Sequence, residues 1–369
     1  MADFSSNLHN CISTLPCNSQ FALKDWYMKN VLLLLVSLTG MLFWQCSRTT
    51  SDASLKSSVD ESVAKINRAM AVISETKGYQ LMTTSDLTKS GESFSDSIDL
   101  ELIAGIYDFK PDTFECRHFM MPFWRFTKTA ESEMMVLHLP QRLVFHPRLL
   151  HDANPPDTVA ENDFTITASE YHYYYSFLNR YDYRLTAGFD LKDEDLGMLE
   201  VTSSGVIFSD RSYSSEYTFT DDYSLLVSYE RGDTAISSFT LYEGDNILLG
   251  EETSFIWKDF HKNERKYTLT IGDIEIVRGS EIDSIQVFLN GVLQTTAGAI
   301  IDDDEDSDGS VCHHRDILLT FDDGTTARLS ELIGPALDTL KTLVDPMREM
   351  YFAKHIIDHL AFTIYYQNR

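Results

Sequence analysis

The sequence predicts a mainly β protein, either an antiparallel β-sandwich or a curved open sheet, with an N-terminal amphipathic helix and C-terminal helices. Apolar and polar residues alternate with a period of two through much of residues 97–330, and turn dipeptides interrupt that alternation. Apolar residues recur at helical spacing in 58–78 and in 331–369. Short strands joined by tight turns are typical of antiparallel sheets, and they leave both β architectures open.

The first predicted element is a helix over residues 58–78. Ser58 and Glu61 have the spacing of a capping box at its start, and Gly78 is a suitable residue for its end. One face carries apolar residues at helical spacing: Val59, Val63, Ile66, Met70 and Ile73. We expect this face to pack against the sheet, with residues 46–57 forming a polar tether before the helix.

Strand-like alternation begins near Ile98 and includes Leu100, Leu102 and Ala104. Asn154-Pro155-Pro156-Asp157 indicates a loop and a candidate sub-boundary near 153–162. Further segments with strand-like composition follow the first: 123–127, 134–139, 164–176, 183–189, 217–219 and 223–229.

Turn sequences separate these segments. Each contains a glycine between strand-like residues: Arg231-Gly232-Asp233, Glu243-Gly244-Asp245, Asn290-Gly291 and Asp323-Gly324. The last two are the strongest hairpin signals, because a type I′ turn needs positive φ at both central residues. We therefore expect neighbouring strands to pair in chain order.

The chain ends in two predicted helices within 331–369. Pro335 to Leu343 and Pro346 to Ile364 each begin with a proline, which suits the first turn of a helix. Apolar residues of the second segment share one face: Met347, Met350, Tyr351, Ile357, Ala361 and Ile364. This face is expected to pack on the sheet.

The charge balance excludes some partners. The chain carries 30 basic and 57 acidic residues, a formal net charge of −27. Binding to nucleic acid requires clustered Lys and Arg that displace counterions from phosphates, so an acidic chain of this kind is not expected to bind nucleic acid. The same charge disfavours peripheral docking on anionic lipid.

The N-terminal region has the layout of an export signal. Met28-Lys29-Asn30 precedes an uncharged apolar stretch, Val31 to Trp44, and Gln45-Cys46 follows. The stretch is shorter than the roughly 20 residues of a membrane-spanning helix and has the length of a signal-peptide core. This arrangement resembles the signal of Bacteroidetes-type bacterial lipoproteins, whose residues before the cysteine are less restricted. The resemblance implies that residues 28–45 are removed and that Cys46 is lipidated and anchors the protein in the cell envelope.

Residues 1–27 do not belong to this signal, so we expect translation to start at Met28 and the preceding residues to be an upstream extension. The alternative keeps them as a cytoplasmic tail before a short membrane anchor. Ser47 and the lack of an acidic run directly after Cys46 favour the outer membrane, with the domain facing the periplasm.

Two segments are candidate metal sites. Asp304, Asp306 and Asp308 alternate before Gly309, which matches the first half of a calcium-binding loop, although Arg315 occupies the position where such a loop has its bidentate acid. A solvated acidic loop is the other interpretation. His355 and His359 are four residues apart on a predicted helix, a spacing that zinc enzymes use. Ordinary surface histidines have the same spacing.

The last candidate is the tyrosine run Tyr171, Tyr173, Tyr174 and Tyr175, whose rings could stack on sugars or apolar ligands. Strand alternation places Tyr174 with His172 on one face and the other tyrosines on the opposite face. No catalytic motif is evident. We therefore expect a non-enzymatic, lipid-anchored envelope protein whose β domain binds a ligand or a protein partner. A metal-dependent envelope hydrolase and a structural subunit of a surface assembly are the alternatives.

Overall fold

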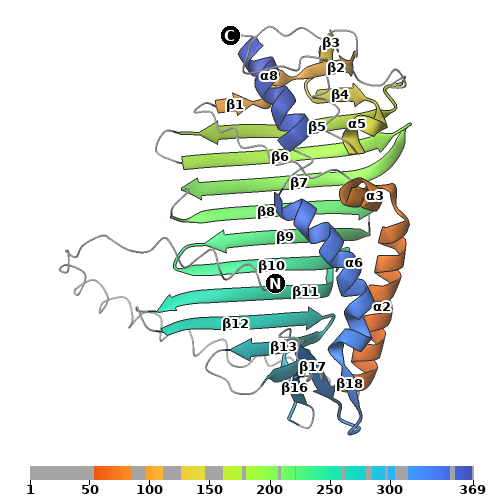
Figure 1. The fold of residues 1–369 in the computed structure, drawn as a ribbon, viewed down its shortest axis with the longest axis vertical. Coiled ribbons are helices and arrows are strands. Elements are labelled where there is room, and N and C mark those ends of the chain that lie inside the picture. The colour runs from red at the N-terminus through yellow and green to blue at the C-terminus, as the bar shows by residue number, and fades with distance from the viewer. Residues whose placement is uncertain are drawn as a thin grey trace, which may run out of the picture. The chain divides into compact units, whose positions relative to one another are not determined.

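An open, 15-stranded sheet forms the body of the part of the chain that the structure describes (Figure 1). The structure is a computed structural model, and Ala53–Arg369 forms one compact unit in it. The ranges described are 54–84, 97–110, 126–145, 161–176, 180–206, 209–220, 222–258, 262–279, 285–295, 298–303, 315–349 and 354–367. The mainly β prediction is confirmed, and of the two architectures left open the chain adopts the open sheet.

Most of the sheet is a meander in which each strand pairs with the next one along the chain. Its strands are β4 (Met135–Leu139), β5 (Phe164–Tyr175), β6 (Arg180–Leu191), β7 (Glu194–Val206), β8 (Arg211–Thr220), β9 (Tyr223–Arg231), β10 (Thr234–Glu243), β11 (Asn246–Lys258), β12 (Lys262–Ile271), β13 (Ile274–Gly279), β14 (Gln286–Leu289) and β15 (Val292–Leu293). Consecutive pairs in this series are antiparallel, and from β5 onward most connections are short turns.

The predicted turns account for several of these connections. Asn290 and Gly291 have φ values of 52° and 73° between β14 and β15, as a type I′ turn requires. Lys192 and Asp193 adopt the same conformation between β6 and β7, with φ values of 51° and 63°. The sequence did not predict this second turn, because neither residue is a glycine or an asparagine.

The other end of the sheet is less regular. Its strands are β1 (Ser97–Asp99), β2 (Gly105–Phe109) and β3 (Phe126–Ala130), and the short helices α4 (Leu100–Ile103) and α5 (Gln141–Phe145) lie between the strands of this region. The prediction of one continuous strand from Ile98 to Ala104 is wrong, since a helical turn replaces its second half. The Tyr107 hydroxyl donates to the Ile103 carbonyl at 3.0 Å and secures the end of that turn, while Leu102 remains 49% exposed.

A second, three-stranded sheet lies next to the start of β14. It contains β16 (Gly298–Asp303), β17 (Arg315–Thr320) and β18 (Thr326–Arg328). A single bridge between Ile285 and Ala299 connects β16 to the residue before β14. Gly324, with φ of 79°, lies in the predicted turn between β17 and β18.

Helices line one face of the large sheet (Figure 1). They are α2 (Leu55–Glu75), α3 (Lys77–Thr84), α6 (Leu329–Glu349), the π-helical turn η3 (Lys354–Asp358) and α8 (His359–Gln367). Helix α2 contacts α6, β11 and β12, and α6 contacts β8, β9, β17 and β18. Within the described ranges, no helix combines the length and the hydropathy needed to cross a membrane.

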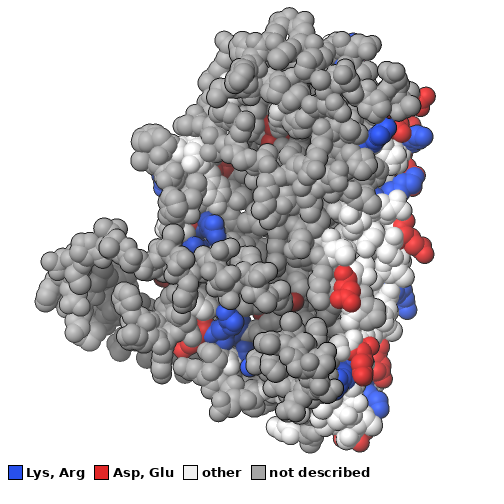
Figure 2. Space-filling view, in the orientation of Figure 1, with Lys and Arg blue, Asp and Glu red and all other residues white. Residues whose placement is uncertain are grey.

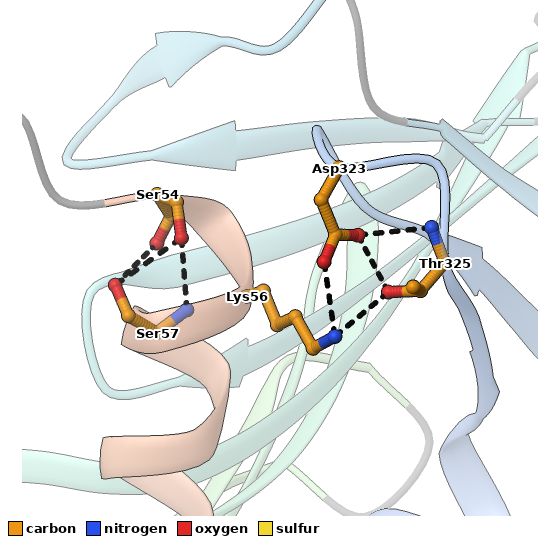
Figure 3. A network of polar contacts seen from close by, with 5 residues as sticks. All are labelled: Ser54, Lys56, Ser57, Asp323 and Thr325. Carbon is orange, nitrogen blue, oxygen red and sulfur yellow. Dashed lines mark hydrogen bonds and ion pairs between the residues drawn. The ribbon is translucent and has the colours of Figure 1, made fainter.

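The N-cap of helix α2 lies four residues before Ser58, the N-cap that the capping-box spacing predicts. Ser54 is the N-cap, and its Oγ accepts from the Ser57 amide at 3.2 Å. The adjacent Lys56 side chain reaches the β17–β18 turn, where its Nζ lies 3.0 Å from both Asp323 Oδ2 and Thr325 Oγ1 (Figure 3). The sequence did not predict this start, because neither Ser54 nor the contact made by Lys56 is part of the apolar stripe from which the helix was predicted.

The prediction that Pro335 and Pro346 each start a separate helix is wrong. Helix α6 begins at Leu329 and runs through both Pro335 and Pro346, which therefore lie inside one helix and do not start two. Prolines remove backbone hydrogen bonds inside a helix, so packing must hold the helix together. The buried residues of one face continue past both prolines: Ile333, Ala336, Leu340, Leu343 and Met347.

The two faces of the sheet differ in chemistry. A cross-strand row on the helix-covered face is buried throughout: Ala187, Leu199, Tyr217, Leu225, Leu241, Leu249, Ile271 and Ile274. The corresponding row on the other face is polar: Arg184, Thr202, Ser214, Ser228, Ser238, Glu252 and Thr268. A single sheet with one apolar face explains why the alternation persists over so many strands.

Candidate functional site

The predicted tyrosine run lies on β5 and divides between the two faces as the alternation predicts. Tyr171 is buried beneath the C-terminal segment, and the Tyr173 ring packs edge-on against Phe362 of α8 with centroids 4.8 Å apart. Tyr174 is on the opposite face and 39% exposed. The run is therefore not a continuous platform, because its covered-face members hold α8 in place.

A buried carboxylate ties the C-terminal segment to the sheet. Asp358, at the end of η3, is 9% exposed, and its Oδ1 accepts from the Tyr183 hydroxyl at 2.9 Å and the Tyr171 hydroxyl at 3.2 Å. Burial raises the pKa of both phenols well above 10, and the neighbouring Asp358 carboxylate raises each pKa further. Both hydroxyls therefore remain protonated donors at neutral pH.

Asp358 lies in the segment that was predicted to bind zinc, and its carboxylate instead accepts these two hydrogen bonds from the sheet. His359 begins α8 directly after it, and the His355 side chain lies outside what the structure describes. Among the described residues, no group of three or more His, Cys, Asp or Glu side chains could hold a metal ion. The zinc interpretation stays a prediction. Cys46 and the candidate calcium residues Asp304, Asp306 and Asp308 also lie outside the described ranges.

A second group of aromatic residues lies farther along the covered face, next to the end of α6. Two adjacent cross-strand rows on β8 to β13 form it, and we call them the tyrosine–arginine strip. The outer row is Arg211, Arg231, Ala235, Phe255 and Arg265. The inner row is Tyr213, Tyr229, Ser237, Thr253, Tyr267 and Arg278.

The strip begins where the helical cover ends. The Tyr213 hydroxyl donates to the Met347 carbonyl near the end of α6, which marks where the described helices cease to cover the sheet. Every member of the strip is partly or well exposed, and Arg265 and Arg278 are in the exposed class. The strip therefore offers aromatic rings and guanidinium groups at a surface, unlike the buried row next to it.

Arg211 is held against an aromatic ring. Its guanidinium carbon lies 4.9 Å from the Tyr229 ring centroid, and its NH2 group donates to the Tyr229 hydroxyl at 3.3 Å. A guanidinium over a ring gains from the cation–π interaction, and the contact also restricts its orientation. Farther along the strip, burial raises the pKa of Tyr267, and the carboxylate of Glu251 raises it further.

The charge of the strip contrasts with that of the chain. The protein carries a formal net charge of −27, yet neither row of the strip contains an Asp or a Glu. Asp210 and Glu251 flank the rows without belonging to them. Figure 2 shows Lys and Arg side chains left of α6 among residues that the structure does not describe, with Asp or Glu side chains beside the lower group.

The opposite face carries two histidine–aspartate pairs. His172 Nδ1 lies 2.6 Å from Asp99 Oδ1, and its Nε2 lies 3.7 Å from Asp182 Oδ2. His138 Nδ1 lies 2.7 Å from Asp108 Oδ1 on the neighbouring strand. These contacts join β1, β2, β4, β5 and β6, so we interpret them as cross-strand ties at the irregular end of the sheet.

Sequence reasoning missed the strip because its residues are scattered from position 211 to position 278. Each strand contributes only one or two of them, and Arg231-Gly232-Asp233 is interpretable from sequence only as a turn. The signal that could have found the strip is the hairpin register. Pairing the strands through their turns aligns Arg211 with Arg231 and Tyr267 with Arg278.

The chain matches no protein-family model, and neither curated proteins nor solved structures include a significant match to it.

Proposed function

We propose that this chain is a lipid-anchored cell-envelope protein, held by an acylated Cys46, whose sheet binds a saccharide chain along the tyrosine–arginine strip. The observation that carries the binding proposal is the strip itself: aromatic residues in register on a face that is not covered by α6. Tyrosine rings pack against the apolar faces of sugars, and their hydroxyls bond to sugar hydroxyls.

The geometry of the sheet suits an extended ligand. Neighbouring strands lie about 4.8 Å apart, so equivalent side chains repeat across the sheet at that interval. A ligand that runs across β8 to β13 can contact one or two residues on each strand. The β-sheet backbone is hydrogen-bonded on both sides in this region, so the side chains are presented by a rigid scaffold.

Affinity electrophoresis in gels that contain dextran, xylan, polygalacturonate or chondroitin sulfate tests the binding proposal. We expect at least one polysaccharide to retard the full chain, and the Tyr229→Ala, Tyr267→Ala double variant to lose most of the retardation. Tyr174→Ala is the matched control, since Tyr174 is an exposed tyrosine on the opposite face. If no polysaccharide retards the protein, or if both variants behave alike, the proposal is wrong.

The proposed anchor has a separate test. Expression in a bacterial host followed by intact-mass analysis should give a product that begins at Cys46 and carries the mass of its acyl chains. Cys46→Ala should abolish the acyl mass and release the protein from membranes. A membrane-bound product that retains Trp26 would contradict the anchor.

A further inference from the structure

We propose that the saccharide bound by the tyrosine–arginine strip is a polyanion, a glycan with carboxylate or sulfate groups, and that two arginine pairs each receive one of its acidic groups. The first pair is Arg211 with Arg231, and the second is Arg265 with Arg278. This inference deepens the proposed function and rests on it.

The first pair places two like charges directly opposite each other. Arg211 on β8 and Arg231 on β9 are register partners, so their Cβ atoms lie about 5 Å apart on the same face. An anionic group between the two guanidinium groups gains charge-assisted hydrogen bonds from both. The contact between Arg211 and Tyr229 already orients one of the donors.

The second pair lies on the next part of the same face. Arg278 on β13 is the register partner of Tyr267 on β12, and Arg265 precedes Tyr267 by two residues on that strand. Arg265 and Arg278 are therefore diagonal neighbours, and both are exposed. Tyr267 neighbours both arginines, and its hydroxyl stays protonated because burial raises its pKa.

The separation of the pairs indicates the charge spacing of the ligand. β9 and β12 are three strands apart in the sheet, a separation of roughly 14 Å. The intervening members of the strip are uncharged: Ala235, Phe255, Ser237 and Thr253. A polymer with acidic groups separated by neutral sugar units fits this alternation of arginine pairs and uncharged residues.

The charge of the whole chain argues for a sparsely charged glycan over a nucleic acid. A polynucleotide carries a phosphate at every unit, and the net charge of −27 repels such a chain over most of the protein surface. A glycan with spaced acidic groups presents its charges only where the arginine pairs lie. The tyrosine rings beside each pair, Tyr229 next to Arg211 and Tyr267 next to Arg278, favour sugar rings over an acidic peptide.

Titration calorimetry of the full chain with hyaluronan, with unsulfated chondroitin and with dextran tests the inference, because the first two polymers alternate one carboxylate-bearing sugar with one neutral sugar. We expect the two acidic glycans to bind and dextran to bind at least about tenfold more weakly, since charge-assisted hydrogen bonds contribute about that factor each. Raising the salt concentration from 50 mM to 500 mM should weaken the binding of the acidic glycans and leave any dextran binding unchanged.

Variants that neutralise the arginines test whether these residues bind the acidic groups. Arg211→Gln with Arg231→Gln should weaken acidic-glycan binding by about tenfold or more, and Arg265→Gln with Arg278→Gln should have a similar effect. Lys65→Gln with Arg68→Gln is the control, because it makes the same charge change on the exposed side of α2. Arg211→Lys with Arg231→Lys keeps the charge and should give an intermediate loss, since lysine cannot form the bidentate contact.

Three results would overturn the inference. If dextran and the acidic glycans bind equally well and both arginine variants bind normally, the strip does not select a polyanion, but it still binds saccharides as proposed. Tighter binding of poly-glutamate or single-stranded DNA than of either acidic glycan assigns the strip to another class of polymer. Binding of none of the glycans removes both proposals. Thermal unfolding of each variant separates these results from loss of the fold.

Discussion

Tyr183→Phe tests whether the buried Asp358 contact anchors the C-terminal segment. The Tyr183 hydroxyl is 2.9 Å from Asp358 Oδ1, and both side chains are less than a tenth exposed. A hydrogen bond to a charged acceptor contributes about 1.5–3 kcal/mol, so we expect Tyr183→Phe to lower the free energy of unfolding by about 2 kcal/mol. The midpoint of thermal unfolding should fall by about 3 °C, because the unfolding entropy grows with the length of the folded unit.

A double-mutant cycle measured by urea unfolding separates the hydrogen bond from other effects of the substitution. In an Asp358→Ala background the hydroxyl has lost this acceptor, so Tyr183→Phe should there cost about 0.5 kcal/mol or less. Tyr79→Phe is the control, because Tyr79 forms an exposed, neutral hydrogen bond of 3.3 Å to Thr342 Oγ1. If Tyr183→Phe costs the same with and without Asp358, the hydrogen bond between the two side chains does not stabilise the C-terminal segment.

The remaining predictions concern pH and backbone geometry. Because burial raises the pKa of Tyr183 above its ordinary value of 10, stability should be unaffected by this group below that pH and should fall as the pH rises above it, which alkaline unfolding curves measure. The Thr325 hydroxyl and amide, followed by Lys56, lower the pKa of Asp323 to about 2. The stability that Asp323 contributes should be present above its unfolded-state pKa and lost as the pH falls through about 2, which an NMR titration of the carboxyl carbon can follow. Gly78→Ala should destabilise the protein, because the new Cβ would lie 2.3 Å from a backbone oxygen of β7. In α6, by contrast, a Cβ added at Gly334 meets no neighbour within 4 Å. Gly334→Ala should therefore stabilise the protein by up to about 1 kcal/mol. Chemical denaturation of the two variants measures these effects, and the prediction is wrong if both substitutions raise, or both lower, the free energy of unfolding.

Local patterns predicted the secondary structure where side chains on one face share one environment. The buried residues of α2 follow the helical stripe, with Ile66 and Ile73 fully enclosed. The alternation on β5 likewise separates Tyr171 from Tyr174. These predictions succeeded because burial of one face depends mainly on the period of the element.

Other features depend on contacts that the local pattern does not contain. Leu102 was predicted to lie in a strand, but the chain turns at α4 and the Tyr107 hydroxyl bonds to the carbonyl of Ile103. Pro335 and Pro346 were predicted to start helices, but packing of the face that includes Leu340 carries α6 through both. Tertiary contacts outweighed local preference in each case.

The sequence by itself determined the mainly β class, the helices at both ends and the pairing of strands through their turns, because each depends on neighbouring residues. Only the tertiary structure decided that the strands form one open sheet, since the same alternation also suits two packed sheets. The same holds for the tyrosine–arginine strip. Arg211 and Arg278 are far apart in the chain, and hydrogen bonding through β8 to β13 brings them to one face.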